Sequence, residues 1–148
     1  MSTLKVDTYL TRGGASEIAI DKLKGVSSAG SMLVVGEGGT NTTNLQQGLL
    51  KTWINFNGTS TIATRVSNNV ASITDNGTGD YTVTFTVAFG VNHYTFSGGL
   101  SSTSDRAILI LDNGVNLDAA ASRLQTIHDG DSKIDCAVVT IQFAGDLA

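Results

Sequence analysis

The chain has 148 residues, of which 41% are hydrophobic and 15% are charged, and its formal net charge is −4 at pH 7. This length predicts one compact domain with a short appendage. The nine Lys and Arg residues are spread along the chain, so we expect no binding to nucleic acid. The apolar runs are too short to cross a bilayer, and the N-terminus lacks the apolar stretch of a signal peptide. We therefore expect no membrane insertion and synthesis in a cytoplasm.

Residues 1–30 contain two short stretches in which apolar and polar residues alternate. Leu4 and Val6 belong to the first stretch, Ile18 and Ile20 belong to the second, and a glycine pair separates them. Such a pattern predicts two short strands joined by a turn. A two-stranded unit of this size is marginally stable alone. We therefore expect it to pair with another protein chain.

Residues 31–52 combine a Gly-rich linker with a predicted short helix. The stretch NTTNLQQGLLKTW opens with residues that cap helices well, Asn44 among them. Leu45, Leu49 and Trp53 recur at i, i+4 and i+8, which predicts one apolar stripe along three helical turns. A single narrow stripe suits packing around an axis shared by several chains, and it also suits packing on a sheet.

From residue 53 onward the sequence is typical of β structure. In YTVTFTVAF, apolar residues at every second position from Tyr81 to Phe89 predict a strand. The stretch DNG at 75–77 is a strong hairpin signal. Cys136 lies in the last predicted strand, and we interpret it as a half-buried small hydrophobe. Many short strands between Gly and Asn turns favour a sandwich-like or barrel-like β domain.

The residues available for catalysis or metal binding are few. Asp75 and Asp80 flank one predicted turn and Asp129 and Asp131 flank another, and a glycosidase would need such a pair of carboxylates. Asp in turns of this kind usually stabilises the turn itself. When its positions are counted from Asp129, HDGDSKID does not match a calcium loop, because the fifth position is Lys133. We predict no catalytic residue, no metal site and no cofactor, and a small glycan hydrolase is kept as an alternative.

Aromatic and amide side chains near predicted turns are the candidate surface contacts. His93 and Tyr94, next to Asn92, are expected at a strand entrance, where flat aromatic faces could bind sugars or proteins. Asn113 and Asn116 belong to a second Asn-Gly turn. We take these five residues as candidate receptor contacts.

The run KTWINFNGTSTIATRVSNNVASITDNGTGDYTVTFT resembles a module of tail-fibre and fibre-like virion proteins of marine tailed bacteriophages, including cyanophages and pelagiphages. WINFNGT, ATRVSNNV and SITDNGTGDYTV carry the likeness. The opening MSTLKVDTYLTRGG and the ending at 141–146 are similar to the same proteins, and residues 95–135 match least. The resemblance implies a homotrimer whose N-terminal part attaches to the virion and whose C-terminal β domain faces the host.

On this resemblance we expect a mainly β chain of three parts. The first, residues 1–30, is an extended segment that binds other virion proteins of the tail or capsid through Leu4, Val6, Tyr9, Ile18 and Ile20. The second, residues 31–52, is a linker and short helix at a trimer axis formed by Leu45, Leu49 and Trp53. The third, residues 53–148, is an antiparallel, jelly-roll-like β-sandwich that contacts a host cell-surface glycan or protein.

The expected protein is a short trimeric tail fibre, made in the bacterial host cytoplasm and carried on the virion. The alternative is a capsid decoration or head-fibre protein. A chain of 148 residues has no room for a long shaft, which favours these short forms over a long fibre.

Overall fold

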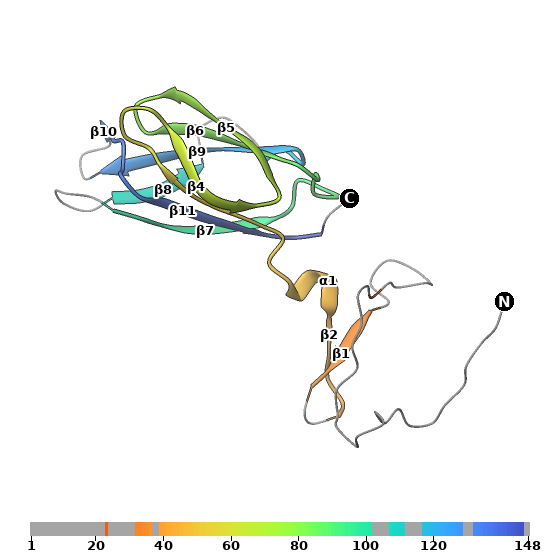
Figure 1. The fold of residues 1–148 in the computed structure, drawn as a ribbon. Helices are drawn as coiled ribbons and strands as arrows, with labels where there is room; N and C mark the ends of the chain where they lie inside the picture. Colours follow the sequence, from red (N-terminus) through yellow and green to blue (C-terminus); the bar gives the residue numbers. More distant parts are fainter. Residues whose placement is uncertain are drawn as a thin grey trace, which may run out of the picture.

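The computed structural model describes residue 23 and residues 32–36, 39–101, 107–111, 117–128 and 132–146. Within these residues the chain is mainly β, and every strand pair is antiparallel (Figure 1). The expectation of a mainly β, antiparallel chain is confirmed. Several predicted contacts lie outside the described residues, namely Leu4, Val6, Tyr9, Ile18, Ile20, Asn113 and Asn116.

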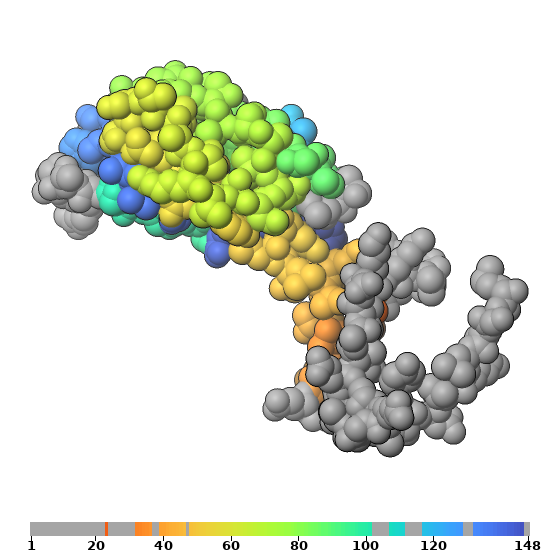
Figure 2. All heavy atoms as spheres, viewed as in Figure 1, coloured from red at the N-terminus to blue at the C-terminus, as the bar shows by residue number. Residues whose placement is uncertain are grey.

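A two-stranded sheet precedes the larger sheets. It consists of β1 (Leu33–Val35) and β2 (Thr42–Asn44), and a single helical turn, α1 (Leu45–Gly48), follows. The three-turn helix expected here is wrong, since strand β2 occupies its start and Trp53 lies in the next strand. Gly48 opposes a longer helix, and so short a helix is marginal without tertiary packing. In Figure 2 the orange to amber atoms of this unit project from the main body.

Two larger sheets make up the rest of the described chain. The first has the order β4-β3-β11-β7 and the second contains β5, β6, β9, β8 and β10, with β9 paired to β6, β8 and β10. The first sheet consists of β3 (Thr52–Asn57), β4 (Ala63–Asn68), β7 (Thr95–Leu100) and β11 (Val139–Ala144). The second consists of β5 (Val70–Gly77), β6 (Asp80–Phe85), β8 (Ala107–Leu111), β9 (Ala121–His128) and β10 (Ser132–Lys133).

Both sheets contribute side chains to one hydrophobic core. Strand β3 alternates along its length: Ile54 and Phe56 are buried, while Trp53 and Asn55 lie on the opposite, half-buried face. Such alternation places every second side chain of a strand on the same face. The buried hydrophobic residues of the larger sheets and their connections are Ile54, Phe56, Tyr81, Val83, Phe85, Phe89, Tyr94, Leu124, Cys136, Val139, Ile141 and Phe143.

The strand predicted to run from Tyr81 to Phe89 ends at Phe85. The chain bends there because the side chain of Asn69 binds the backbone beyond the strand. Val87 N donates to Asn69 Oδ1 at 2.8 Å, and Asn69 Nδ2 donates to Val87 O at 3.0 Å. Val87 is therefore exposed, whereas Phe89 returns to the core and stacks on an aromatic neighbour.

Candidate binding site

A groove of about 600 Å³ lies on the face of the first sheet that points away from the core. This volume falls within the range of small-ligand sites, roughly 300–1,000 Å³. Its apolar walls come from Leu50, Trp53 and Val66. Polar side chains line the remainder, and these are Asn55, Ser97, Thr140 and Gln142.

Strand register brings these groove residues together from distant parts of the sequence. Trp53 lies opposite Gln142, which lies opposite Ser97. One pair further along the strands, Asn55 lies opposite Thr140 on one side and Val66 on the other. Residues directly opposite in an antiparallel pair share a face of the sheet. Two cross-strand rows therefore form the groove, and the inner strands β3 and β11 each contribute one residue to both rows.

Hydrogen bonds within the groove hold several of its polar side chains in place. Gln142 Nε2 donates to Ser97 Oγ at 2.8 Å, and Thr140 Oγ1 donates to Gly99 O at 3.0 Å. Arg65 Nη1 donates to Asn55 Oδ1 at 3.1 Å. Among the described residues, Gln142 Oε1 and Asn55 Nδ2 have no protein partner. The groove thus presents fixed acceptors and donors to whatever enters it.

Glycine keeps the β7 side of the groove open. A Cβ on Gly99 would lie 3.2 Å from Thr140 Oγ1, so any larger side chain there would project into the space beside Thr140. Gly99 has an ordinary backbone conformation and does not need glycine for its φ. The absence of a side chain at this position therefore matters for the shape of the groove.

The groove continues into a second hollow of about 110 Å³, which shares Leu50, Ser97 and Gln142 with it. The second hollow reaches Thr95 and Ala144 at the end of the sheet. Neither hollow is lined by a charged side chain. The combined surface is an uncharged, elongated depression.

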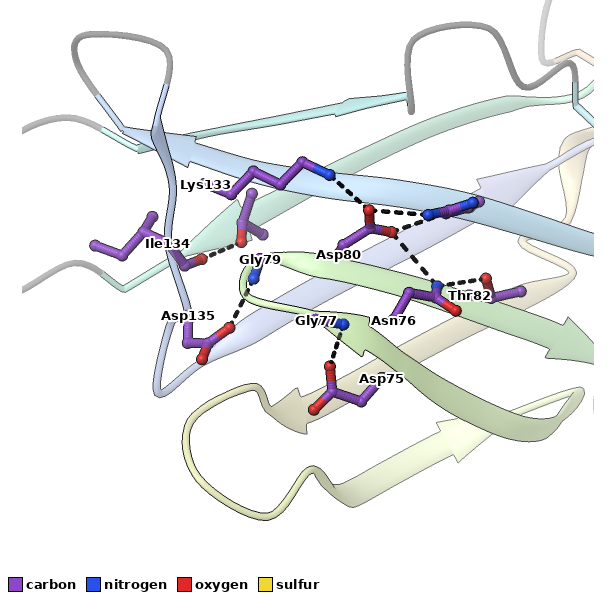
Figure 3. Close-up of polar contacts among 11 residues, drawn as sticks. Asp75, Asn76, Gly77, Gly79, Asp80, Thr82, Lys133, Ile134 and Asp135 are labelled. Atoms are coloured by element: carbon purple, nitrogen blue, oxygen red, sulfur yellow. Dashed lines mark hydrogen bonds and ion pairs between the residues drawn. The ribbon is translucent and has the colours of Figure 1, made fainter.

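The carboxylate of Asp80, by contrast, forms ion pairs with two basic side chains (Figure 3). Arg123 donates to both of its oxygens, at 2.8 and 3.1 Å, and Lys133 Nζ donates to Oδ2 at 2.6 Å. The hydrogen bond from Arg123 is the main reason that the pKa of Asp80 falls from 3.8 to about 2, with Lys133 adding to the effect against the opposing effect of burial. Such a group stays ionised at neutral pH and is poorly suited to act as a general acid.

The other acidic residues of this region stabilise the hairpin between β5 and β6 (Figure 3). Asp75 Oδ1 accepts a hydrogen bond from Gly77 N at 2.9 Å, as expected for Asp in a turn. Asp135 Oδ1 accepts hydrogen bonds from Gly79 N at 2.7 Å and from the Tyr81 hydroxyl at 2.9 Å. Burial, and secondarily Asp135, raises the pKa of Tyr81.

The Asp75–Asp80 pair is thus engaged in structural contacts, and Asp129 and Asp131 lie outside the described residues. Within the ranges that the structure describes, no group of three His, Cys, Asp or Glu side chains could hold a metal ion.

The candidate receptor contacts occupy different environments. Asn92 and His93 are exposed on the connection between β6 and β7. Tyr94 is only 6% exposed, its ring stacks on Phe89 with a centroid distance of 4.4 Å, and its hydroxyl lies 3.0 Å from the carbonyl oxygen of Asp118. The prediction that Tyr94 is a surface contact is therefore wrong.

The helical stripe of Leu45, Leu49 and Trp53 is not formed, because α1 ends at Gly48. Leu49 is 52% exposed, and Trp53 lines the groove instead. Sequence reasoning missed the groove. Period-2 alternation within β3 places Trp53 and Asn55 on one face, but nothing local shows that β11 and β7 lie beside them.

The chain matches no model of a known protein family, no curated protein and no solved structure. No helix in the described part of the chain is long and apolar enough to span a membrane.

Proposed function

We propose that this protein is a structural component of a bacteriophage virion, a short homotrimeric tail fibre without a cofactor. In this proposal residues 1–30 attach to other virion proteins, and the β domain recognises a glycan or protein on the host cell surface. The protein is made in the host cytoplasm and acts on the virion. The resemblance described above supports the class of protein, and the exposure of the segment before β3 supports its assembly.

The observation that carries the proposal is the apolar surface of residues 33–50. Five large aliphatic side chains there are 45–58% exposed, namely Leu33, Val34, Val35, Leu49 and Leu50. The first three form strand β1, and the last two follow α1 in the connection to β3. A two-stranded sheet this small is marginal alone, and clustered exposed apolar side chains mark interaction sites. Burial against copies of the same segment would supply the missing contacts, with Leu45 and Leu49 near the shared axis.

We further propose that the two larger sheets form a β-sandwich. The single core to which both sheets contribute supports this arrangement, which is typical of stable antiparallel layers. Jelly-roll-like connectivity stays a prediction.

The test of assembly is the mass of the full chain in solution, measured by light scattering. We expect three times the chain mass of 15.3 kDa. The double variant Leu33→Ser/Val35→Ser should lower this mass, because it removes two exposed aliphatic side chains from one face of β1. Val91→Ser is a matched control, since Val91 and Leu33 are both 53% exposed, and it should leave the mass unchanged. A wild-type monomer would contradict the trimer.

The position on the virion separates the tail fibre from the second candidate, a capsid decoration or head-fibre protein. Gold-labelled antibody against the β domain should mark the tail of intact particles. Labelling of the head would favour the second candidate, and absence of the chain from purified particles would overturn both.

A further inference from the structure

We propose that the groove across β3, β11 and β7 binds a neutral saccharide, with the indole ring of Trp53 against one sugar ring and amide side chains on its hydroxyl groups. This inference rests on the host-recognition part of the proposed function, because it chooses the ligand class and places the contact. It moves that contact from the connection containing Asn92 and His93 to the outer face of the first sheet.

Trp53 provides the apolar platform of the site. Its side chain is half-buried on the outer face of β3, and Leu50 and Val66 complete the apolar walls. The face of an aromatic ring carries partial negative charge, and the C–H groups on one side of a pyranose ring carry partial positive charge. A sugar ring lying against Trp53 would therefore combine apolar burial with electrostatic attraction.

The polar lining favours a ligand rich in hydroxyl groups. Asn55 Nδ2 is a donor and Gln142 Oε1 is an acceptor, and neither has a protein partner among the described residues. The other amide atom of each side chain is already bonded, Asn55 Oδ1 to Arg65 and Gln142 Nε2 to Ser97. These bonds fix the orientation of both amide groups, and therefore of Asn55 Nδ2 and Gln142 Oε1. A hydroxyl group can both donate and accept, and it can therefore satisfy either atom when water is displaced.

The absence of charge in the lining argues for a neutral ligand. Both hollows are lined by uncharged residues only. The nearby guanidinium of Arg65 is engaged with Asn55 and with Ala137 O, the latter at 2.6 Å. A carboxylate or sulfate placed in the groove would lose hydration without gaining a dedicated counter-ion, which is costly.

The position of the groove on a sheet face disfavours an added peptide strand. The backbone groups of β3 and β11 pair with neighbouring strands on both sides, so they cannot form a ladder with a further chain. Recognition must use side chains. The continuity of the groove with the smaller hollow toward Thr95 and Ala144 fits a ligand of more than one sugar unit.

The sequence contains a single tryptophan, so the emission of Trp53 reports directly on the site. The full-length protein is titrated with neutral gluco-, manno- and galacto-oligosaccharides of about four to six units, a length chosen to span both hollows, and with oligouronates of equal length. We expect a saturable change in emission with at least one neutral series and none with the uronates. Absence of saturation with all neutral series, or a response to uronates alone, overturns the proposal.

Three variants test whether the saccharide binds in the groove. Their affinities are measured by calorimetry, because one of the variants lacks tryptophan. Trp53→Ala and Gln142→Ala should each weaken binding, the first by at least about tenfold, and Gly99→Val should weaken it by filling the groove. His93→Ala is the control, and it should bind like the wild type. Equal affinity in all four proteins would place binding elsewhere and overturn the proposal. Near-ultraviolet and far-ultraviolet circular dichroism spectra check that Gln142→Ala is folded, and this variant changes only an exposed side chain on the outer face of β11.

A second copy of this chain could also fill the groove, and light scattering of Trp53→Ala distinguishes this possibility from a saccharide ligand. We expect an unchanged mass, and a reduced mass would show that the groove is buried between copies and would overturn the saccharide proposal. Failure of saccharide binding leaves the mass and virion-labelling results untouched, so the failure of this inference and that of the proposed function are distinguishable.

Discussion

At the scale of single residues, Asp80 is a buried charge neutralised by two cations that stay partly in solvent. Its side chain is 5% exposed, whereas those of Arg123 and Lys133 are 38% and 40% exposed. The acid therefore bears most of the desolvation, and loss of either cation would leave the other in place. Such an arrangement connects β6 to β9 and β10 at the edge of the core. It also makes the domain less stable when acid protonates Asp80.

The pKa of Asp80 predicts the direction of this dependence. The folded-state pKa of about 2 lies below the ordinary value of 3.8, so the carboxylate contributes stability above about pH 4, and this contribution is lost as the pH falls toward 2. The shift corresponds to about 2 kcal/mol. Asp80→Asn should lower the free energy of unfolding at pH 7 by about that amount and flatten its decline between pH 4 and 2, as measured by urea denaturation.

Asp75→Asn serves as the control for Asp80→Asn, because Asp75 is exposed and binds only a backbone N–H of its own turn. We expect it to change the free energy of unfolding by less than about 1 kcal/mol. Equal losses for the two variants would show that the Arg123–Asp80–Lys133 contact does not contribute as described.

At the scale of elements, Asn69 is the junction through which the chain leaves the first sheet and enters the second. It is the single residue between β4 and β5, and its φ is +57°. Its side chain also donates to Thr52 Oγ1 at 2.9 Å, in addition to its two bonds to Val87. Asn tolerates this left-handed conformation better than most residues. One side chain thus fixes the start of β3, the end of β6 and the crossover between sheets.

Substitution of Asn69 separates its backbone role from its hydrogen bonds. Asn69→Ala should destabilise the domain by about 2–3 kcal/mol, because it loses three hydrogen bonds and because Ala tolerates the left-handed conformation less well than Asn. Asn69→Gly loses the same bonds without that strain and should cost about 1 kcal/mol less. The measurement is the midpoint and slope of denaturant unfolding. The control is Asn68→Ala at the preceding residue, whose side chain makes one hydrogen bond, to Lys51 O. It should lower the free energy of unfolding least of the three variants, and a larger decrease there would contradict this account.

Local sequence patterns predicted the elements that depend on local forces. The alternation of β3 and β11 is visible because each strand has one face in the core, and the hairpin signal at Asp75–Gly77 is visible because its hydrogen bond lies within three consecutive residues. The end of β6 at Phe85 was missed, since it depends on Asn69 far earlier in the chain.

Long-range pairing explains the remaining errors. Tyr94 looked like a loop residue, but its ring contacts Phe143 of β11, and its hydroxyl lies 3.0 Å from the carbonyl oxygens of Asp118 and Ala121. The groove depends on the register of Trp53 with Gln142, which no periodicity within a single strand can show. The helix from Asn44 was overestimated, because capping and spacing signals were not supported by packing.

At the scale of the whole molecule, the two larger sheets share one core, and this favours unfolding as a single unit. Cys136 is the only cysteine of the chain and is 1% exposed within that core. Burial raises the pKa of its thiol, so both access and ionisation oppose its reaction with thiol reagents.

The rate of Cys136 modification should therefore report on opening of the core. We expect labelling of the native protein to be slower than that of the urea-unfolded chain by orders of magnitude, and to accelerate in Asp80→Asn by the factor by which the lost stability raises the population of the open state. Mass spectrometry of quenched samples gives both rates. Rapid labelling of the wild type in native buffer would mean that the segment around Cys136 opens independently of the core.

The place where the chain enters the domain also determines how force would pass through it. Thr52, the first residue of β3, pairs with Phe143 near the end of β11. Tension between the two termini would therefore peel these strands apart one hydrogen bond at a time. Leu50 and Trp53 line the groove at this same entrance. A pull between a ligand in the groove and the N-terminal segment would be borne by a few residues beside the tether, and most of the core would stay unloaded.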